Sequence, residues 1–188
     1  MSQSELLARV INVLDAAGID YMVTGSTVSS IQGEPRSTHD IDVVVALTAA
    51  SADALLRAFP SPEFYLDEQA VREALVRKDM FNLLQPDTGE KVDFWLLTDD
   101  AFDQARFRGK VGTSFEGITL KVSRPEDTIL MKLRWCKMSG GSEKQFQDAL
   151  RIFEVQGSGL DQSHLDYWAT QLGLNELLAR LRTAAGAG

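Results

Sequence analysis

The sequence has 188 residues, of which 44% are hydrophobic and 24% are charged, a composition typical of a soluble globular protein with one substantial core. Its formal net charge of −8 argues against a broad nucleic-acid-coating surface, because such a surface needs clustered lysine and arginine. One cysteine cannot form an intramolecular disulfide, and no apolar run approaches the roughly 20 residues of a membrane helix, so we expect a cytoplasmic protein with no membrane partner.

The first two thirds of the chain alternate between helical and strand patterns. Residues 4–17 carry apolar side chains at helical spacing, with Ser4 as the expected N-cap and Gly18 as the stop. The same criteria, with turn residues between the segments, predict strands at 20–24, 41–46, 80–85, 91–97, 110–115 and 118–122, and helices at 27–32, 48–59, 66–77 and 98–107.

After Ser123 the pattern becomes helical throughout. Ser123 is the expected cap of the first of these helices, with Pro125 in the first turn and acidic residues at the positive end of the helix dipole. Glycines divide the region into four predicted helices, at 124–137, 143–155, 162–172 and 175–183. We therefore predict an α/β (α+β) fold in which residues 1–122 form a core with a small mixed sheet, and residues 123–188 form a helical portion packed on it.

A strand that runs into Gly25-Ser26 and then into a helix is the first candidate for function. Glycine lets a phosphate approach the backbone closely, and a helix N-terminus offers N–H donors and the positive end of a dipole. The Ser26 hydroxyl can add a donor. Strand–Gly–Ser–helix segments are common, so this one alone indicates no function.

Two aspartates stand one residue apart at the mouth of a valine run, in the stretch T-H-D-I-D-V-V-V. Side chains alternate along a strand, so Asp40 and Asp42 should point the same way, about 7 Å apart. Like charges held this close repel each other, and in a half-buried pair the repulsion raises a pKa or requires a cation. The pair is either a solvated entry to the strand or a metal site.

Asp93 is the only charge inside the apolar strand core V-D-F-W-L-L. Strands disfavour aspartate, and burying an unpaired carboxylate costs several kcal/mol, so its position needs an explanation. A metal shared with Asp40 and Asp42 supplies one, because three converging carboxylates make a hard oxygen site suited to Mg²⁺. We interpret the aromatic residues Trp95 and Trp135 as parts of the core.

This arrangement resembles the nucleotidyltransferase superfamily related to DNA polymerase β, in which a strand ending in Gly-Ser precedes an Asp-x-Asp strand and a later strand with one aspartate. "EPRSTHDIDVVV" is similar to the Arg-x-Thr-x-Asp-h-Asp motif of small bacterial members, including toxin-type enzymes of abortive-infection systems. "RPEDTILMKLRW" and "EKQFQDAL" resemble their later Lys-Leu helix and Lys-Asp-x-x-Asp motif, so the resemblance runs from about Val23 to Leu150. Gln145 departs from this last motif at its first acidic position, whereas Asp148 matches the second.

The resemblance implies a role for each matching residue. Gly25 and Ser26 would hold a nucleoside triphosphate such as ATP, and Asp40, Asp42 and Asp93 would bind two Mg²⁺ ions, with Asp93 also acting as the general base. Two cationic side chains complete the predicted site. Lys132 would reach the triphosphate, and Arg36 would contact a phosphate or form a structural ion pair with Asp40.

The predicted reaction is transfer of NMP from an NTP to a hydroxyl acceptor, with release of pyrophosphate. The acceptor could be a tRNA end, a protein or a small molecule such as an aminoglycoside, and the acidic balance favours a cationic small molecule or a protein over long RNA. The alternative is a non-catalytic nucleotide-sensing or partner-binding module of a toxin–antitoxin pair, with a cognate antitoxin as its partner. The complete set of carboxylates argues against that alternative, since a protein without catalysis has no use for their mutual repulsion.

Overall fold

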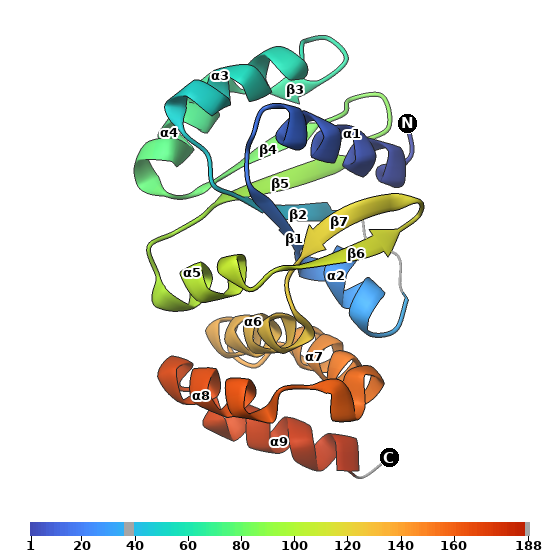
Figure 1. The fold of residues 1–188 in the computed structure, drawn as a ribbon, viewed down its shortest axis with the longest axis vertical. Coiled ribbons are helices and arrows are strands. Elements are labelled where there is room, and N and C mark those ends of the chain that lie inside the picture. The colour runs from blue at the N-terminus through green and yellow to red at the C-terminus, as the bar shows by residue number, and fades with distance from the viewer. Residues whose placement is uncertain (36–39, 187–188) are drawn as a thin grey trace. The chain divides into compact units, whose positions relative to one another are not determined.

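The computed structural model describes residues 1–35 and 40–186 (Figure 1). The chain folds as two compact units, Met1–Thr27 with Thr38–Val122 and Val28–Ser37 with Ser123–Gly188. The division falls inside helix α2 (Gly25–Gln32), so this one helix contributes residues to both units. In the part of the chain that the structure describes, no helix combines the length and apolar character needed to cross a membrane.

The first unit is built on a mixed sheet that, within the described residues, has seven strands in the order β3-β4-β5-β2-β1-β7-β6. Strand β2 runs parallel to β5 and β1 runs parallel to β7, while the other neighbours are antiparallel. This sheet confirms the predicted mixed α/β fold class. The strands are β1 (Tyr21–Thr24), β2 (Asp40–Val45), β3 (Tyr65–Leu66), β4 (Met80–Leu84), β5 (Lys91–Leu96), β6 (Val111–Phe115) and β7 (Ile118–Val122).

The two central strands, β2 and β5, present different chemistry on their two faces. On one face, Ile41, Val43 and their neighbours on β5 are almost fully buried, and Phe81 of β4 stacks on Phe94 with ring centroids 5.0 Å apart. Figure 1 shows α1, α3 and α4 together on one side of this sheet. The opposite face is apolar only at one end, where Phe107 of α5 packs with residues of β1 and β2. The helices of this unit are α1 (Gln3–Ala16), α3 (Ala49–Ala58), α4 (Glu68–Arg77) and α5 (Ala101–Arg108).

Three helices have N-caps other than those predicted, and α2 begins at Gly25 rather than at residue 27. Arg124, not Ser123, is the N-cap of α6 (Pro125–Met138), and the Ser123 hydroxyl is hydrogen-bonded to the Thr128 hydroxyl instead.

The other two caps accept hydrogen bonds from backbone N–H groups of the first turn. Ser2, not Ser4, caps α1, because Ser2 and Glu5 form a reciprocal capping box in which each side chain binds the other's backbone N–H. Asp100, not Thr98, caps α5, because its carboxylate accepts hydrogen bonds from two backbone N–H groups of the first turn at 3.0 Å.

The second unit is helical. α6 (Pro125–Met138) contacts α7 (Glu143–Gln156) and α8 (Gln162–Leu172), and α9 (Asn175–Gly186) contacts α7 and α8. A short 3-10 helix, Gly157–Gly159, follows α7. The buried apolar positions of these helices are filled mainly by leucine, with isoleucine and alanine. Trp135 is 41% exposed on α6, so its assignment to the core was wrong.

The end of α2 belongs to this helical unit. Gln156 donates a hydrogen bond to the backbone oxygen of Gln32 at 2.6 Å, and the Gln32 side chain donates to the backbone oxygen of Ser123 at 2.6 Å. A Cβ on Gly33 would lie 3.2 Å from the backbone nitrogen of Ile152, so the two backbones approach closely there. The contact explains why glycine occupies this position.

Candidate active site

Polar side chains form a row across four neighbouring strands of the first unit. Asp42 of β2 lies beside Asp93 of β5 in direct register, and Asn82 of β4 and Thr24 of β1 extend the row on either side. Asp40 precedes Asp42 by two residues, so it lies on the same face. The three predicted metal-binding carboxylates therefore share one face of two adjacent strands.

Gly25 brings the start of α2 against this row. A Cβ on Gly25 would lie 2.0 Å from Oδ2 of Asp42, and the φ angle of Gly25 is +68°. No side chain fits between the backbone at this point and the Asp42 carboxylate, and L-residues other than glycine rarely adopt this φ. The N-terminal end of α2 and the Asp42 carboxylate therefore form one compact feature.

The first turn of α2 carries hydroxyl groups next to its positive dipole end. Ser26 follows Gly25 directly, and Thr27 is 6% exposed. Among the described residues, the Thr27 hydroxyl has no hydrogen-bond partner. A buried polar atom without a partner is uncommon, and a phosphate oxygen bound at this helix start is one group that would satisfy it.

Asp93 is buried, but it is not unpaired as the sequence analysis assumed. Its Oδ1 accepts a hydrogen bond from the Asn82 side chain at 2.9 Å, and its Oδ2 lies 3.0 Å from the ammonium of Lys91. Lys91 stands two residues before Asp93 on β5 and so points to the same face. These two donors satisfy both oxygens of the buried carboxylate.

Lys91 joins two of the three carboxylates. Its Nζ also lies 3.4 Å from Oδ1 of Asp40, the residue beside it in the β2–β5 register. The hydrogen bond that Lys91 donates to Asp93 raises the pKa of Lys91, partial burial opposes this, and the charges of Asp93 and Asp40 raise it further, so that the pKa lies above its usual value.

Asp42 has a different donor. The indole nitrogen of Trp95 donates a hydrogen bond to Oδ1 of Asp42 at 3.1 Å. The Trp95 ring is only partly buried and packs against the cluster of Met22, Val44 and Phe107. Trp95 is therefore both a packing residue and a hydrogen-bond donor to the candidate site, which is more than the core role predicted for it.

The donor set of the row fits a hard divalent cation such as Mg²⁺, which prefers carboxylate oxygens. The backbone register places the carboxylates side by side, and glycine at position 25 leaves room beside Asp42. In the described part of the chain, however, no three carboxylate, histidine or cysteine side chains stand close enough together to hold an ion. The side chains as shown are engaged by Lys91, Asn82 and Trp95 instead.

Of the two cationic residues predicted for the site, the structure describes Lys132 but not Arg36. Lys132 belongs to the second unit, is 5% exposed, and places its ammonium 2.8 Å from Oδ2 of Asp148. Gln145, the departure from the expected acidic motif, has a buried side-chain oxygen with no hydrogen-bond partner in residues 1–35 and 40–186. Arg36 lies outside the described residues. The predicted role of Lys132 at a triphosphate rests on the resemblance alone.

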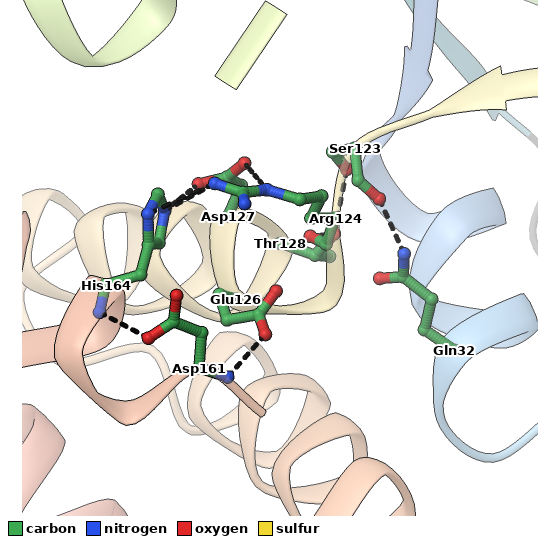
Figure 2. A network of polar contacts seen from close by, with 8 residues as sticks. All are labelled: Gln32, Ser123, Arg124, Glu126, Asp127, Thr128, Asp161 and His164. Atoms are coloured by element: carbon green, nitrogen blue, oxygen red, sulfur yellow. Dashed lines mark hydrogen bonds and ion pairs between the residues drawn. The ribbon is translucent and has the colours of Figure 1, made fainter. Parts of the chain in front are cut away.

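A second polar network lies at the start of α6 (Figure 2). Asp127 is fully buried, its Oδ1 lies 2.7 Å from Nε2 of His164, and its Oδ2 lies 3.4 Å from Nε of Arg124. Arg124 is also 3.1 Å from Nδ1 of His164. The Nη2 atom of Arg124, which makes this contact, also lies 3.2 Å from Nε2 of His164, so the guanidinium contacts both ring nitrogens. This network joins α6 to α8.

Sequence reasoning missed Asn82 and Lys91, although each left a signal. The two-residue period of a strand already places Lys91 on the face of Asp93. A hairpin with its turn at 86–90 places Asn82 opposite Asp93 once the register is known. The missing step was to ask which neighbouring side chains would satisfy Asp93 before turning to a metal.

Three solved structures resemble the whole chain. The antibiotic-resistance factor ANT(2")-Ia in complex with adenylyl-2"-tobramycin matches with a TM-score of 0.57 and 11% identity over 98% of this chain and 99% of that chain. An antigenic nucleotidyltransferase-like protein from Paracoccidioides brasiliensis matches with a TM-score of 0.54 and 20% identity over 94% and 91%. The solution structure of ANT(2")-Ia matches with a TM-score of 0.52 and 14% identity over 98% of this chain and 94% of that chain. The chain has the nucleotidyltransferase fold.

At the level of the fold, the predicted resemblance to nucleotidyltransferases is confirmed. No protein-family model matches the sequence, and a search of curated proteins finds no match. Identities of 11–20% carry the architecture and nothing about the acceptor or the metal. The chemistry therefore has to be argued from the side chains of the carboxylate row.

Proposed function

We propose that this chain is a Mg²⁺-dependent nucleotidyltransferase that transfers NMP from an NTP such as ATP to a hydroxyl acceptor and releases pyrophosphate. The observation that carries the proposal is the direct register of Asp42 and Asp93, with Asp40 on the same face and the Gly25 backbone against Asp42. The N-terminus of α2, which can bind phosphates, thus lies next to carboxylates that can bind a divalent cation and accept a proton.

The side chains of this chain have distinct tasks in the proposed reaction. The first turn of α2, with Gly25, Ser26 and the Thr27 hydroxyl, would bind the triphosphate through backbone N–H groups and hydroxyls. Asp93 would accept the proton of the acceptor hydroxyl, and Asn82 would hold the Asp93 carboxylate in place through its hydrogen bond.

The metal would be held by Asp40, Asp42 and Asp93, and the resemblance implies two Mg²⁺ ions. Trp95 would orient Asp42 through its hydrogen bond. When bound, Mg²⁺ supplies charge neutralisation at the phosphates and lowers the pKa of the acceptor hydroxyl.

For the acceptor we propose a cationic small molecule of the aminoglycoside class. Two observations support it: ANT(2")-Ia, which shares the fold over nearly the whole chain, was solved with adenylyl-2"-tobramycin, and this chain has a net charge of −8. A protein side chain or a tRNA end are the other acceptors to be tested. We place the reaction in the cytoplasm, a location supported by the single cysteine, which cannot form an intramolecular disulfide.

The test is a transfer assay with each NTP and Mg²⁺ in the presence of tobramycin, tRNA or total protein, read by pyrophosphate release and by the mass of the product. Asp93→Asn should lower transfer by roughly 100-fold or more, because it removes the proton acceptor and one metal-binding charge. Asp87→Asn, at an exposed position in the turn between β4 and β5, makes the same chemical change away from the row and should leave transfer unchanged.

Three results would speak against parts of this proposal. Absence of NMP transfer from every NTP would favour the non-catalytic nucleotide-sensing or partner-binding module, including the toxin–antitoxin role. Undiminished transfer in Asp93→Asn would show that another group accepts the proton. Transfer to tRNA or to protein alone would keep the enzyme and replace the acceptor.

A further inference from the structure

Both oxygens of the Asp93 carboxylate are engaged by protein donors of different kinds. Oδ1 accepts a hydrogen bond from the neutral amide of Asn82, and Oδ2 faces the charged ammonium of Lys91. The same ammonium lies 3.4 Å from Asp40. Lys91 therefore provides, between two proposed metal ligands, the positive charge that a divalent cation would otherwise provide.

We propose that Lys91 is the resident counter-ion of the metal site, and that a divalent cation binds by displacing its ammonium from Asp93 and Asp40. This inference rests on the proposed function, because it concerns the same three carboxylates. The inference adds to the proposed function that Lys91 controls how tightly the site binds its metal.

Of the donors at the row, Lys91 is the one that has to give way. A metal ion and an ammonium repel each other, whereas the neutral donors Asn82 and Trp95 add no positive charge beside a cation. The Lys91 side chain is also one-third exposed on a flexible four-carbon stem, so it can turn to solvent without breaking the strand. Asn82 and Trp95 can keep their hydrogen bonds while the second oxygen of each carboxylate takes part in metal binding.

The distances agree with this assignment, since the ammonium lies 3.0 Å from Asp93 and 3.4 Å from Asp40 and so offsets part of their negative charge. The ion pairs should in turn stabilise the metal-free protein, in which Asp93, Asp42 and Asp40 would otherwise repel one another. The cost of displacing Lys91 then appears as a weaker affinity for the metal.

The experiment measures binding of MgCl₂ alone, without nucleotide, by isothermal titration calorimetry and by thermal melting of the full chain. Lys91→Met removes the charge and keeps the apolar stem, and Lys91→Gln is a second variant with a neutral donor that keeps the test usable should the first fold poorly. Lys121→Met is the matched control, because it removes the same charge from another aspartate-paired lysine of the first unit.

Both Lys91 variants should bind Mg²⁺ about tenfold more tightly than wild type, a modest effect for removing a unit charge that lies 3.0 and 3.4 Å from ligand oxygens. Without metal they should melt at a lower temperature than wild type, and Mg²⁺ should raise their melting temperature more. Lys121→Met should bind Mg²⁺ as wild type does.

The outcomes separate this inference from the proposed function. Equal Mg²⁺ affinity in wild type and both Lys91 variants would overturn the role of Lys91 and leave the metal site standing. Equal tightening in Lys121→Met would also overturn it, because the effect would then come from net charge. No Mg²⁺ binding by any of these proteins would overturn the metal site itself, and this inference with it.

Discussion

Gly25 is the residue of the candidate site that tolerates a substitution least. Gly25→Ala would force a Cβ to within 2.0 Å of the Asp42 carboxylate and would place alanine at a φ of +68°. The backbone conformation alone costs about 1–2 kcal/mol in a residue with a Cβ. We expect Gly25→Ala to lower the melting temperature and to abolish Mg²⁺-dependent nucleotide binding, measured by thermal melting and calorimetry.

Gly89→Ala separates the two effects in that prediction. Gly89 has a φ of +75° but no atom within 4 Å of the position of a Cβ, so alanine there carries the backbone strain without the collision. Gly89→Ala should destabilise the protein and leave nucleotide binding intact. If both variants bind nucleotide as wild type does, the contact between Gly25 and Asp42 is not part of a nucleotide site.

Asp20, next to the first residue of β1, gives the stability of the first unit a predictable pH dependence. Partial burial raises the pKa of Asp20, but the hydrogen bond from Lys110 and the charges of Lys110 and Lys121 outweigh it, so the pKa lies below its usual value. A lowered folded-state pKa means that the stabilisation is complete above the unfolded value of about 3.9 and is lost as the pH falls through the folded value.

The variant Asp20→Asn tests this pH dependence. At neutral pH its free energy of unfolding should be lower than that of wild type by up to about 1 kcal/mol. The effect should be small because the carboxylate is half exposed and solvent screens its ion pairs. The difference from wild type should shrink below about pH 4, which urea unfolding at several pH values would show. A difference that stays constant down to pH 2 would mean that the ion pairs of Asp20 contribute nothing.

At the scale of the elements, the periodicity of the sequence predicts strands and helices, but it does not predict which elements lie side by side in the fold. The two-residue period correctly places Asp40 and Asp42 on one face of β2. It cannot show that β5 lies beside β2 in parallel and in register, because that depends on the order of the strands across the whole sheet. Short β3 was missed for a related reason, since two residues carry no periodicity.

The same limit explains the errors at the candidate site. Asp93 could be recognised as an anomaly from the sequence, because it stands in an apolar strand. Its partner Asn82 comes from a neighbouring strand, and its partner Lys91 was overlooked although it lies on the same strand. Sequence reasoning thus found the carboxylates and omitted the donors that surround them.

The polar network between α6 and α8 leads to a prediction about these two elements (Figure 2). His164→Ala would remove the closest partner of the fully buried Asp127 and leave Arg124 as its remaining donor in the network. A buried acceptor that loses a hydrogen bond costs about 1–3 kcal/mol, so the free energy of unfolding in urea should fall by that amount. Gln171→Ala, at an exposed position on α8, should change it by less than about 0.5 kcal/mol.

A double-mutant cycle checks the cause. In the background of Asp127→Asn position 127 carries no charge, so His164→Ala should cost less than in wild type. Equal costs in the two backgrounds would show that His164 stabilises the helices through packing and not through Asp127.

At the scale of the whole molecule, the two units differ in how the chain supplies them. The second unit combines residues 28–37 with residues 123–188, and the whole of β2 to β7 lies between these stretches in the sequence. Periodicity predicted the helices on either side, but nothing local to residues 28–35 shows that they pack with a segment more than a hundred positions later, such as Gln156.

This discontinuity sets an order of events during synthesis. A ribosome adds about 5–20 residues per second, so the end of α2 leaves it on the order of ten seconds before Ile152 and Gln156 do. Throughout that interval the native contacts of Gln32 and Gly33 with α7 cannot form, while the strands of the sheet emerge one after another. The sheet can therefore form before the end of α2 makes its contacts with α7. The helical unit is the last part of the nascent chain to acquire its native contacts.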